Sequence, residues 1–559
     1  MAFAPDKPVI VQSDRSILLE TDNPAFEDAR DCLASFAELV KSPEHIHTYR
    51  ITPLSLWNAA AAGITAEQVL SGLDRYSKYE VPQNIIAEVR ENISRYGRLK
   101  LYRPADGPLV LESEDALLVT ELLNQKTLQP YITGSPDLKR IFVKPAERGN
   151  LKCALIKLGF PVEDLAGYVD GAPLPLHLRG KTLSGRDFGL RKYQKESVDA
   201  FHAGGTNQGG SGVIVLPCGA GKTIVAIGTI HLLQTQTLVL TTNTVALRQW
   251  KEELLDKTSL TEEQIGEYSG DTKEIRPVTI ATYQVLTYRK AKDSPFVHFS
   301  LFDEGQWGLI IYDEVHLLPA PVFRATASLQ ARRRLGLTAT LVREDGREED
   351  VFSLIGPKKY DVPWKVLEKQ GWIAQALCTE VRVRMPEEDR YRYAIADKRT
   401  KFRIASTNPS KAHLCELLIE RHKEDNVLVI GQFLDQLKVL SKRFKAPIIT
   451  GRTPTRERQR LYGDFKTGKI KLLIVSKVAN FAIDLPDANV AIQVSGTFGS
   501  RQEEAQRLGR IPRPKRDNTI ARFYSLVSRE SCDQDYSVKR QLFLTEQGYR
   551  YEIITEDQV

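Results

Sequence analysis

The chain of 559 residues has few cysteines, no CxxC pair and no long apolar run. Scattered cysteines argue against a zinc site or an iron–sulfur cluster and are typical of a reducing compartment. No stretch approaches the ~18 consecutive apolar residues that a membrane span needs. The opening MAFAPDKPVIVQSD also lacks the basic and apolar regions of a signal peptide. The sequence therefore predicts a soluble intracellular protein without a membrane partner, and it contains no internal repeat.

The composition is that of a globular protein with an uneven charge distribution. Hydrophobic residues make up 42% of the chain and charged residues 27%, which excludes global disorder. At roughly 150 residues per domain, the length allows three or four domains. Residues 1–180 carry 20 basic and 24 acidic side chains, whereas the rest carry 58 and 47, so −4 and +11 give the net +7. The basic remainder permits a polyanionic partner.

Short β-branched runs alternate with helical stretches after residue 183. Continuous apolar strands separated by helices indicate buried parallel sheets, so we predict two doubly wound α/β lobes. The expected strands are 213–216, 237–240, 278–282, 309–313 and 335–339 in the first series, and 427–431, 447–450, 471–475, 490–494 and 521–527 in the second.

The first 180 residues show a different pattern. A capping box beginning at Thr65 predicts one helix, and Pro82 opens a second helix that stops at Gly97. With the strand-like segment 99–102 they form either a winged-helix-like unit or a small helical accessory domain. A strand at 141–143 and a helix at 151–158 predict a small α+β module after them.

The segment Leu216–Thr223 (LPCGAGKT) has the composition of a phosphate-binding loop between a strand and a helix. Gly219, Ala220 and Gly221 would let backbone N–H groups surround the phosphates of ATP, and the helix N-terminus adds partial positive charge. Lys222 would reach the β- and γ-phosphates, and the Thr223 hydroxyl would bind Mg²⁺. The pattern departs from GxxxxGKT because Leu216 occupies the position of the first glycine.

An apolar strand at 309–312 leads into Asp313-Glu314-Val315-His316. Two carboxylates at the end of such a strand lie at the sheet edge where ligands of open α/β sheets bind. We expect Asp313 to hold Mg²⁺ and Glu314 to orient or deprotonate the attacking water.

Four motifs in this order give the chain a family resemblance. Segments 219–223, 313–316, 338–340 and 506–513 (QRLGRIPR) are similar to motifs I, II, III and VI of superfamily 2 helicases. The order of TAT and RED at 338–345, a basic and aromatic insert at 380–409 and TFGSRQEEAQRLGR at 497–510 resemble the DNA repair helicase XPB family. The resemblance covers about 185–530, and HTYRITPLSLWNAAAAG extends it to the N-terminal region of bacterial members.

The resemblance implies further roles at the nucleotide. Arg510 and Arg513 would reach the γ-phosphate from the second lobe, since a guanidinium fork meets phosphate oxygens bidentately. Pro512 stands between them, where the family has leucine; it displaces Arg513 if a helix continues there and is harmless if the helix ends. Arg191 and Gln194 resemble the glutamine motif that contacts adenine.

The resemblance also implies contacts with DNA and coupling to ATP. In the insert, Arg392 and Lys401 would contact phosphates, and Tyr391, Tyr393 or Phe402 would stack on bases; the alternative is an amphipathic helix whose aromatics pack locally. Asp484 belongs to a segment similar to motif V, which links the ATP and DNA sites. The other residues implied are Thr242, Asn243, Thr282, Tyr283, Thr338, Thr340, Arg343, Glu344 and Asp345.

The implied architecture is α/β, with two RecA-like lobes, a thumb-like insert and N-terminal accessory domains. The implied activity is that of an ATP- and Mg²⁺-dependent 3′-to-5′ DNA helicase or translocase in nucleotide excision repair. It would act at junctions of single strand and duplex in a prokaryotic, nucleoid-associated setting, with a repair nuclease or other repair proteins as candidate partners. Alternatives are a double-stranded DNA translocase that never separates strands and a DNA-binding scaffold with a weak ATPase. The expected domains are 1–112 (accessory), 113–183 (damage-recognition-like α+β), 184–375 (lobe 1, ATP-binding), 376–409 (thumb-like insert) and 410–559 (lobe 2).

Overall fold

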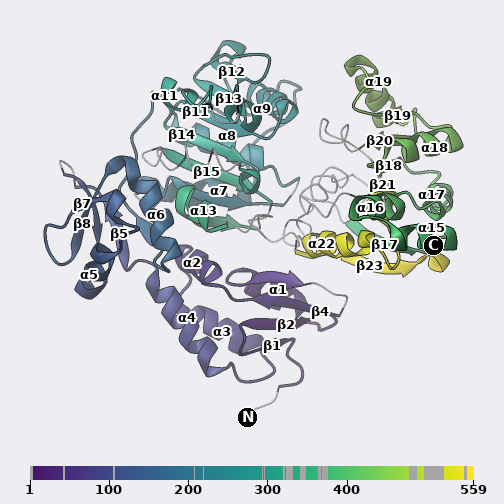
Figure 1. Cartoon of the computed structure of the whole chain (residues 1–559). Coiled ribbons are helices and arrows are strands. Elements are labelled where there is room, and N and C mark those ends of the chain that lie inside the picture. Colours follow the sequence, from purple (N-terminus) through teal and green to yellow (C-terminus); the bar gives the residue numbers. More distant parts are fainter. Residues whose placement is uncertain are drawn as a thin grey trace. The chain divides into compact units, whose positions relative to one another are not determined.

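The computed structural model forms two compact units (Figure 1). The first comprises residues 1–40, 45–216 and 221–362, and the second comprises 41–44, 217–220 and 363–559. The residues that the structure describes are 4–41, 45–104, 107–206, 208–217, 219–291, 294, 296–318, 322, 326, 332–339, 348–362, 367, 370, 376–476, 488–496, 521–546 and 550–559.

The N-terminal part of the first unit combines a small sheet with four helices. The strands lie in the order β1-β2-β4-β3, and the pairings of β2 with β1 and β4 are antiparallel. The predicted capping box is confirmed, because the Gln68 N–H donates to Thr65 Oγ1 at 3.2 Å and the Thr65 N–H to Gln68 Oε1 at 2.9 Å. The elements are β1 (Val9–Val11), β2 (Ser16–Glu20), α1 (Phe26–Ala34), β3 (Glu38–Lys41), β4 (Ile46–Arg50), α2 (Pro53–Ala61), α3 (Ala66–Tyr76) and α4 (Gln83–Arg95).

The predicted strand at 99–102 belongs to the next module, not to the preceding helices. It is β5 (Leu99–Tyr102), and it pairs with β6 (Leu109–Glu112) and β9 (Val162–Asp164). The winged-helix-like interpretation is therefore wrong, and the expected boundary at 112/113 falls inside a five-stranded sheet of order β7-β8-β6-β5-β9. The other elements of this module are α5 (Ala116–Asn124), β7 (Ile132–Gly134), β8 (Arg140–Val143) and α6 (Arg148–Lys157).

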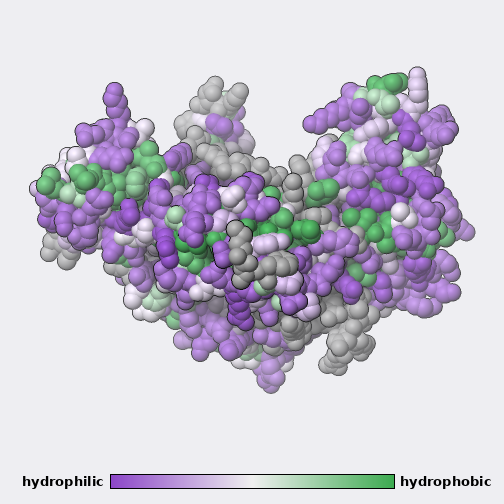
Figure 2. Space-filling model, turned by 90° about the horizontal axis from the view of Figure 1, so that it is seen from below, coloured by the Kyte–Doolittle hydropathy of each residue, from purple (hydrophilic) through white to green (hydrophobic). Residues whose placement is uncertain are grey.

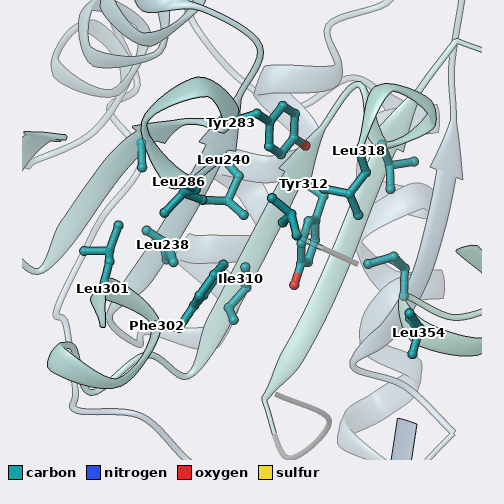
Figure 3. Close-up of a cluster of buried hydrophobic side chains, with 14 of the residues drawn as sticks. Leu238, Leu240, Tyr283, Leu286, Leu301, Phe302, Ile310, Tyr312, Leu318 and Leu354 are labelled. Carbon is teal, nitrogen blue, oxygen red and sulfur yellow. The ribbon is translucent and has the colours of Figure 1, made fainter. Parts of the chain in front are cut away.

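Lobe 1 contains a seven-stranded parallel sheet of order β12-β13-β11-β14-β15-β10-β16. All five predicted strands of this series are confirmed. Large apolar side chains fill one core against the sheet, among them Leu240, Phe302 and Tyr312 (Figure 3). The strands are β10 (Ser211–Val215), β11 (Thr237–Thr241), β12 (Ile265–Tyr268), β13 (Val278–Thr282), β14 (Leu309–Asp313), β15 (Arg333–Thr338) and β16 (Lys358–Asp361). The helices are α7 (Lys192–His202), α8 (Lys222–Leu233), α9 (Thr244–Lys257), α10 (Tyr283–Leu286), α11 (Leu301–Glu304) and α13 (Glu348–Leu354).

The second unit also contains a seven-stranded parallel sheet, of order β19-β20-β18-β21-β22-β17-β23. Its five predicted strands are confirmed. The strands are β17 (Ala376–Val383), β18 (Val427–Gly431), β19 (Ile448–Ile449), β20 (Leu472–Ser476), β21 (Val490–Gln493), β22 (Ala521–Ser528) and β23 (Arg550–Thr555). The helices are α15 (Glu387–Ile395), α16 (Lys398–Ser406), α17 (Ser410–Arg421), α18 (Leu434–Phe444), α19 (Thr455–Lys466) and α22 (Cys532–Glu546).

The expected insert at 376–409 is shorter in the structure. Its first eight residues form β17, which pairs with both β22 and β23 inside the sheet. The insert proper is therefore the helix pair α15 and α16, which pack on each other.

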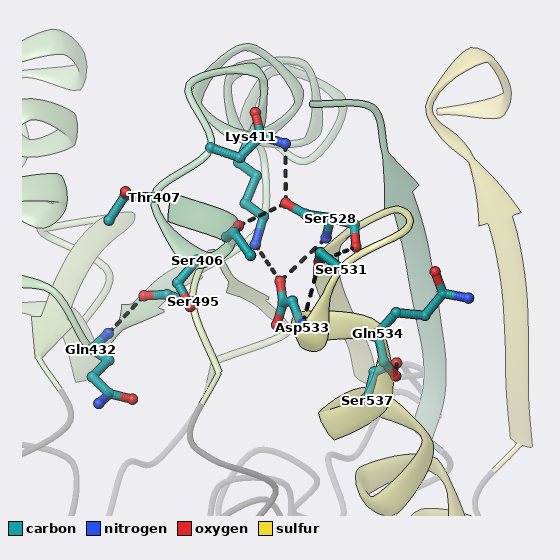
Figure 4. A network of polar contacts seen from close by, with 12 residues as sticks. Ser406, Thr407, Lys411, Gln432, Ser495, Ser528, Ser531, Asp533, Gln534 and Ser537 are labelled. Atoms are coloured by element: carbon teal, nitrogen blue, oxygen red, sulfur yellow. Dashed lines mark hydrogen bonds and ion pairs between the residues drawn. The ribbon is translucent and has the colours of Figure 1, made fainter. Parts of the chain in front are cut away.

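A buried ion pair joins α17, the helix after the insert, to α22, and Ser528 of β22 connects it to the insert (Figure 4). Lys411 Nζ lies 2.7 Å from Asp533 Oδ2, and the two side chains are 0% and 1% exposed. The N–H of Ser528 donates to the same carboxylate oxygen at 3.2 Å, and the Ser528 hydroxyl donates to the Ala405 carbonyl at 2.7 Å. These contacts fix α16 and α17 against β22.

Hydrophilic residues cover most of the face shown in Figure 2, with smaller hydrophobic patches between them. Among the described residues, we find no helix of the length and apolar character that a membrane span requires.

Candidate nucleotide-binding site

The phosphate loop lies where the sequence predicts it, between β10 and α8. Gly219 and Gly221 both have φ of +82°, a backbone conformation that L side chains rarely adopt. A Cβ on Gly221 would lie 2.6 Å from Nε2 of Gln194, so an alanine here would require movement of the Gln194 side chain in addition to a strained backbone. Lys222 and Thr223 follow as the first two residues of α8, at the positive end of its dipole.

Gln194 brings the predicted glutamine motif to this loop. The side chain is 3% exposed, and its Oε1 accepts the N–H of Arg191 at 3.0 Å, which fixes it at the start of α7. The close approach of Gln194 to Gly221 places the motif beside the phosphate loop. Its contact with adenine stays a prediction.

Both motif II carboxylates stand at the carboxyl end of β14. In the sheet, β15 lies between β14 and β10, so the ends of these strands share one edge with the phosphate loop. Glu314 has φ of +50°, and its Oε1 lies 3.4 Å from Lys222 Nζ. The structure thus brings together the lysine and the glutamate that the sequence singles out.

His316 connects this carboxylate to the next strand. Its Nδ1 lies 3.5 Å from Glu314 Oε2 and 2.6 Å from Oγ1 of Thr338, at the end of β15. Thr338 is fully buried. The Thr338 side chain is therefore directed at His316 inside the lobe, and the coupling role of motif III stays a prediction.

The electrostatics at Asp313 favour a bound cation. Burial and the negative charge of Glu314 raise the pKa of Asp313 to about 6, although a hydrogen bond from Trp250 and the charge of Lys222 oppose this. Two adjacent carboxylates beside one ammonium leave negative charge that a divalent cation would balance. Carboxylate and hydroxyl oxygens are the donors that Mg²⁺ prefers, so Asp313 and Thr223 fit the metal.

Trp250 and the hydroxyl of Tyr283 are contacts of Asp313 that the sequence did not reveal. The Trp250 indole N–H donates to Asp313 Oδ2 at 2.9 Å, and the Tyr283 hydroxyl donates to the Asp313 carbonyl at 2.9 Å. A tryptophan in the helix that follows Thr242 and Asn243 was the available signal, since a buried indole N–H needs an acceptor.

The residues predicted to contact DNA at the ends of β11 and β13 differ in exposure. Thr242 and Asn243 are half-buried, and Asn243 Oδ1 accepts the Ala246 N–H at 3.0 Å, at the start of α9. Thr282 accepts the Val285 N–H at 3.3 Å and is 2% exposed; Tyr283 is 3% exposed. The prediction that the Thr282 and Tyr283 side chains contact DNA is wrong for this conformation, because both are directed into the lobe.

The insert residues also separate into exposed and buried groups. Arg392 is 65% exposed and lies 3.3 Å from Asp389. Lys401 Nζ lies 5.5 Å from the centre of the Tyr393 ring. Phe402 is 2% exposed and packs on other rings, those of Phe433 and Tyr536, at 5.9 and 5.5 Å between centroids. Stacking of Phe402 on DNA is therefore contradicted, and this ring packs locally. Tyr391 is 71% exposed, so its stacking on bases stays a prediction.

Several predicted site residues fall outside the described residues, and their roles stay predictions. They are Thr340, Arg343, Glu344, Asp345, Asp484, Arg510 and Arg513.

Comparison with known proteins gives a consistent set of relatives. Residues 367–559 match the family model described as ERCC3/RAD25/XPB C-terminal helicase, 187–343 match "Type III restriction enzyme, res subunit", and 9–134 match "Helicase conserved C-terminal domain". The chain is 56% identical over 554 residues to the DNA 3′-5′ helicase XPB of Kineococcus radiotolerans, covering 99% of this chain and 97% of that one. It is 54% identical to the DNA 3′-5′ helicase XPB of Mycobacterium tuberculosis, with 99% and 98% coverage. It is 34% identical to the general transcription and DNA repair factor IIH helicase/translocase subunit XPB/SSL2 of Saccharomyces cerevisiae, with 98% and 72% coverage.

Proposed function

Because the chain belongs to the XPB family of ATP-dependent DNA 3′-5′ helicases, we propose that it uses ATP hydrolysis at the Lys222–Glu314 site to move 3′-to-5′ along DNA and to separate its strands. The observation that carries this proposal is the 3.4 Å approach of Lys222 to Glu314 beside two left-handed glycines. Separating duplex DNA costs ~1.4 kcal/mol per base-pair step, so sustained unwinding needs coupled hydrolysis.

In this proposal, each side chain of the site has a separate task. Lys222 binds the β- and γ-phosphates, and Glu314 orients the attacking water and accepts its proton. Asp313 and Thr223 would hold Mg²⁺, which when bound neutralises charge that develops on the phosphates. His316 keeps the Glu314 carboxylate in place from the side of β15. In the second lobe, Arg510 and Arg513 would complete the site.

Two substitutions test the site. Lys222→Ala should abolish DNA-stimulated ATP hydrolysis by removing a phosphate contact. Glu314→Gln should lower it by ~10²–10⁴-fold, the usual contribution of a general base. Glu262→Gln is a matched control, because Glu262 is 74% exposed and pairs only loosely with Lys251 at 4.0 Å. Full turnover in Glu314→Gln, with the fold verified by circular dichroism, would refute the assignment.

Strand separation is distinguished from translocation alone by two displacement assays. A helicase should release a labelled strand from a partial duplex with a 3′ overhang, and a pure translocase should displace only a third strand from a triplex. Steady-state ATPase with and without DNA tests the remaining alternative, a DNA-binding scaffold, which predicts little stimulation.

We further propose that exposed cations of the insert contact DNA phosphates. Arg392 and Arg399 lie on α15 and α16 with exposed side chains. Log affinity falls as log salt concentration rises, and each lost phosphate contact should make this decline less steep by ~0.7–0.9. We expect this flattening in the Arg392→Gln/Arg399→Gln variant and not in Lys423→Gln, whose side chain is 66% exposed beside Glu420. An unchanged slope would reject a DNA-contacting insert.

The cellular role that we propose is repair of damaged DNA by nucleotide excision, with a nuclease or other repair proteins as partners. It rests on the names of the relatives. Cells that carry Glu314→Gln in place of the natural chain should be more sensitive to ultraviolet light, and unchanged survival would refute the role.

A further inference from the structure

Trp250 lies inside lobe 1 with its one polar atom directed at motif II. It sits on α9, and 2% of its surface is exposed. Its indole N–H donates to Asp313 Oδ2 at 2.9 Å across 63 positions of sequence. A phenylalanine would fill most of the same space, so packing alone does not require the nitrogen.

A second side chain holds the same aspartate by its backbone. The Tyr283 hydroxyl, on α10, donates to the Asp313 carbonyl at 2.9 Å, and Tyr283 is 3% exposed. Asp313 is thus fixed at two points, at a carboxylate oxygen by α9 and at the main chain by α10. Both helices begin at the segments predicted to meet DNA, 242–243 and 282–283.

We propose that Trp250 is a positioning residue for the ATPase reaction, which holds the Asp313 carboxylate in the orientation that binds Mg²⁺, and that Tyr283 supports it through the main chain. A carboxylate has about four lone-pair sites, and the indole N–H uses one of them. The bond therefore restricts rotation of the carboxylate while leaving other sites for the cation. Groups that hydrogen-bond a metal-binding carboxylate typically change metal affinity by ~10–100-fold when they are removed.

This inference rests on the proposed role of Asp313 as a Mg²⁺ ligand. Lobe 1 offers a matched control in Trp307, which is also buried and donates its indole N–H at 2.9 Å, but to the Leu301 carbonyl. Trp307→Phe removes the same atom from the same kind of environment without touching Asp313. A structural effect alone should appear in both variants.

The test measures equilibrium binding of a fluorescent N-methylanthraniloyl-ADP to the full chain over a series of Mg²⁺ concentrations and in EDTA. Mg²⁺ should enhance binding of the nucleotide, and Trp250→Phe should raise the Mg²⁺ concentration at which this enhancement is half-maximal by ~10-fold or more. The affinity for the nucleotide in EDTA should be unchanged. Tyr283→Phe should shift that Mg²⁺ concentration in the same direction by less, and it decides the question if Trp250→Phe does not fold. Trp307→Phe should leave the Mg²⁺ dependence unchanged.

The outcomes separate this inference from the proposed site. If Asp313→Asn abolishes the Mg²⁺ enhancement while Trp250→Phe and Tyr283→Phe match the natural chain, the positioning role is refuted alone. If the shift in Trp250→Phe equals that in Trp307→Phe, its cause is general loosening of the lobe, which also refutes it. If Asp313→Asn retains the full enhancement, the metal site fails and the inference fails with it.

Discussion

Removing Lys411 should destabilise the second unit strongly, because it leaves a carboxylate buried. Lys411 and Asp533 are 0% and 1% exposed, and their charged atoms are 2.7 Å apart. Breaking one side of a buried ion pair costs ~3–5 kcal/mol, whereas exposed pairs contribute ~0–1 kcal/mol. The N–H of Ser528 and the position of Asp533 at the start of α22 still stabilise the anion in Lys411→Met. The cost should therefore lie near the lower end, about 3 kcal/mol.

The assay is thermal unfolding of the full chain by calorimetry, with hydrogen exchange to identify the second unit's transition. For a unit of this size, 1 kcal/mol corresponds to ~2–4 °C, so Lys411→Met should lower the Tm by ~6–12 °C. Lys423→Met, at an exposed pair 3.7 Å from Glu420, should lower it by ~4 °C or less. Combining Lys411→Met with Asp533→Leu should recover much of the loss, since no unpaired charge stays buried.

Two results would refute this reasoning. One is a Lys411→Met shift no larger than that of Lys423→Met, which would mean that water reaches the pair in solution. The other is that Lys411→Met/Asp533→Leu loses as much stability as the two single variants added together, which would mean that packing, not charge, determines the loss of stability.

Two further predictions concern the first unit. Asp164→Asn should destabilise the module of residues 99–164 by ~3–5 kcal/mol at pH 7, measured by urea titration. The reason is that Arg148 Nη2 and Lys152 Nζ lie 2.7 and 2.8 Å from its buried carboxylate. The control is Asp170→Asn, which should change stability by less than ~1 kcal/mol because Asp170 is 85% exposed. Gly221→Ala should weaken nucleotide binding at least ~10-fold. The alanine would have a backbone strain of ~1–3 kcal/mol, and its Cβ would lie 2.6 Å from Gln194 Nε2. The control is Gly63→Ala, which is also left-handed but has no atom within 4 Å of the added Cβ, and it should leave binding unchanged.

Each of these has a result that would contradict it. The charges of Lys152 and Arg148 lower the pKa of Asp164, although burial alone would raise it, so its stabilisation is present above pH ~4 and is lost only in stronger acid. Equal urea midpoints for the Asp164 and Asp170 variants would contradict the buried network. Equal nucleotide affinities for the two glycine variants would show that the close approach to Gln194 is not maintained in solution.

The strands that the sequence predicts are those whose apolar runs are continuous, because each is buried on both faces of a parallel sheet. Among the lobe strands that the sequence analysis missed, β17 reads ALCTEVRV and carries two charges, so its pattern resembles the basic insert that follows. In the structure Glu380 is fully buried, and its carboxylate contacts Arg382 and the Tyr551 hydroxyl. Arg382 balances the charge of Glu380, and a hydroxyl 171 positions away donates a hydrogen bond to it, so a segment whose sequence is typical of an exposed one is buried in the sheet.

For the ATP site, the sequence by itself determined the loop, the lysine and the two carboxylates, since glycines before GKT and acids after an apolar strand are local patterns with a local chemical reason. It could not determine which way Tyr283 and Phe402 point, because a helix or strand end offers an aromatic both an inner and an outer side. Only the tertiary structure decided that both turn inward. It also brought Trp250 to Asp313, because β11 pairs directly with β14 and the helix after β11 therefore lies beside the strand that ends in motif II.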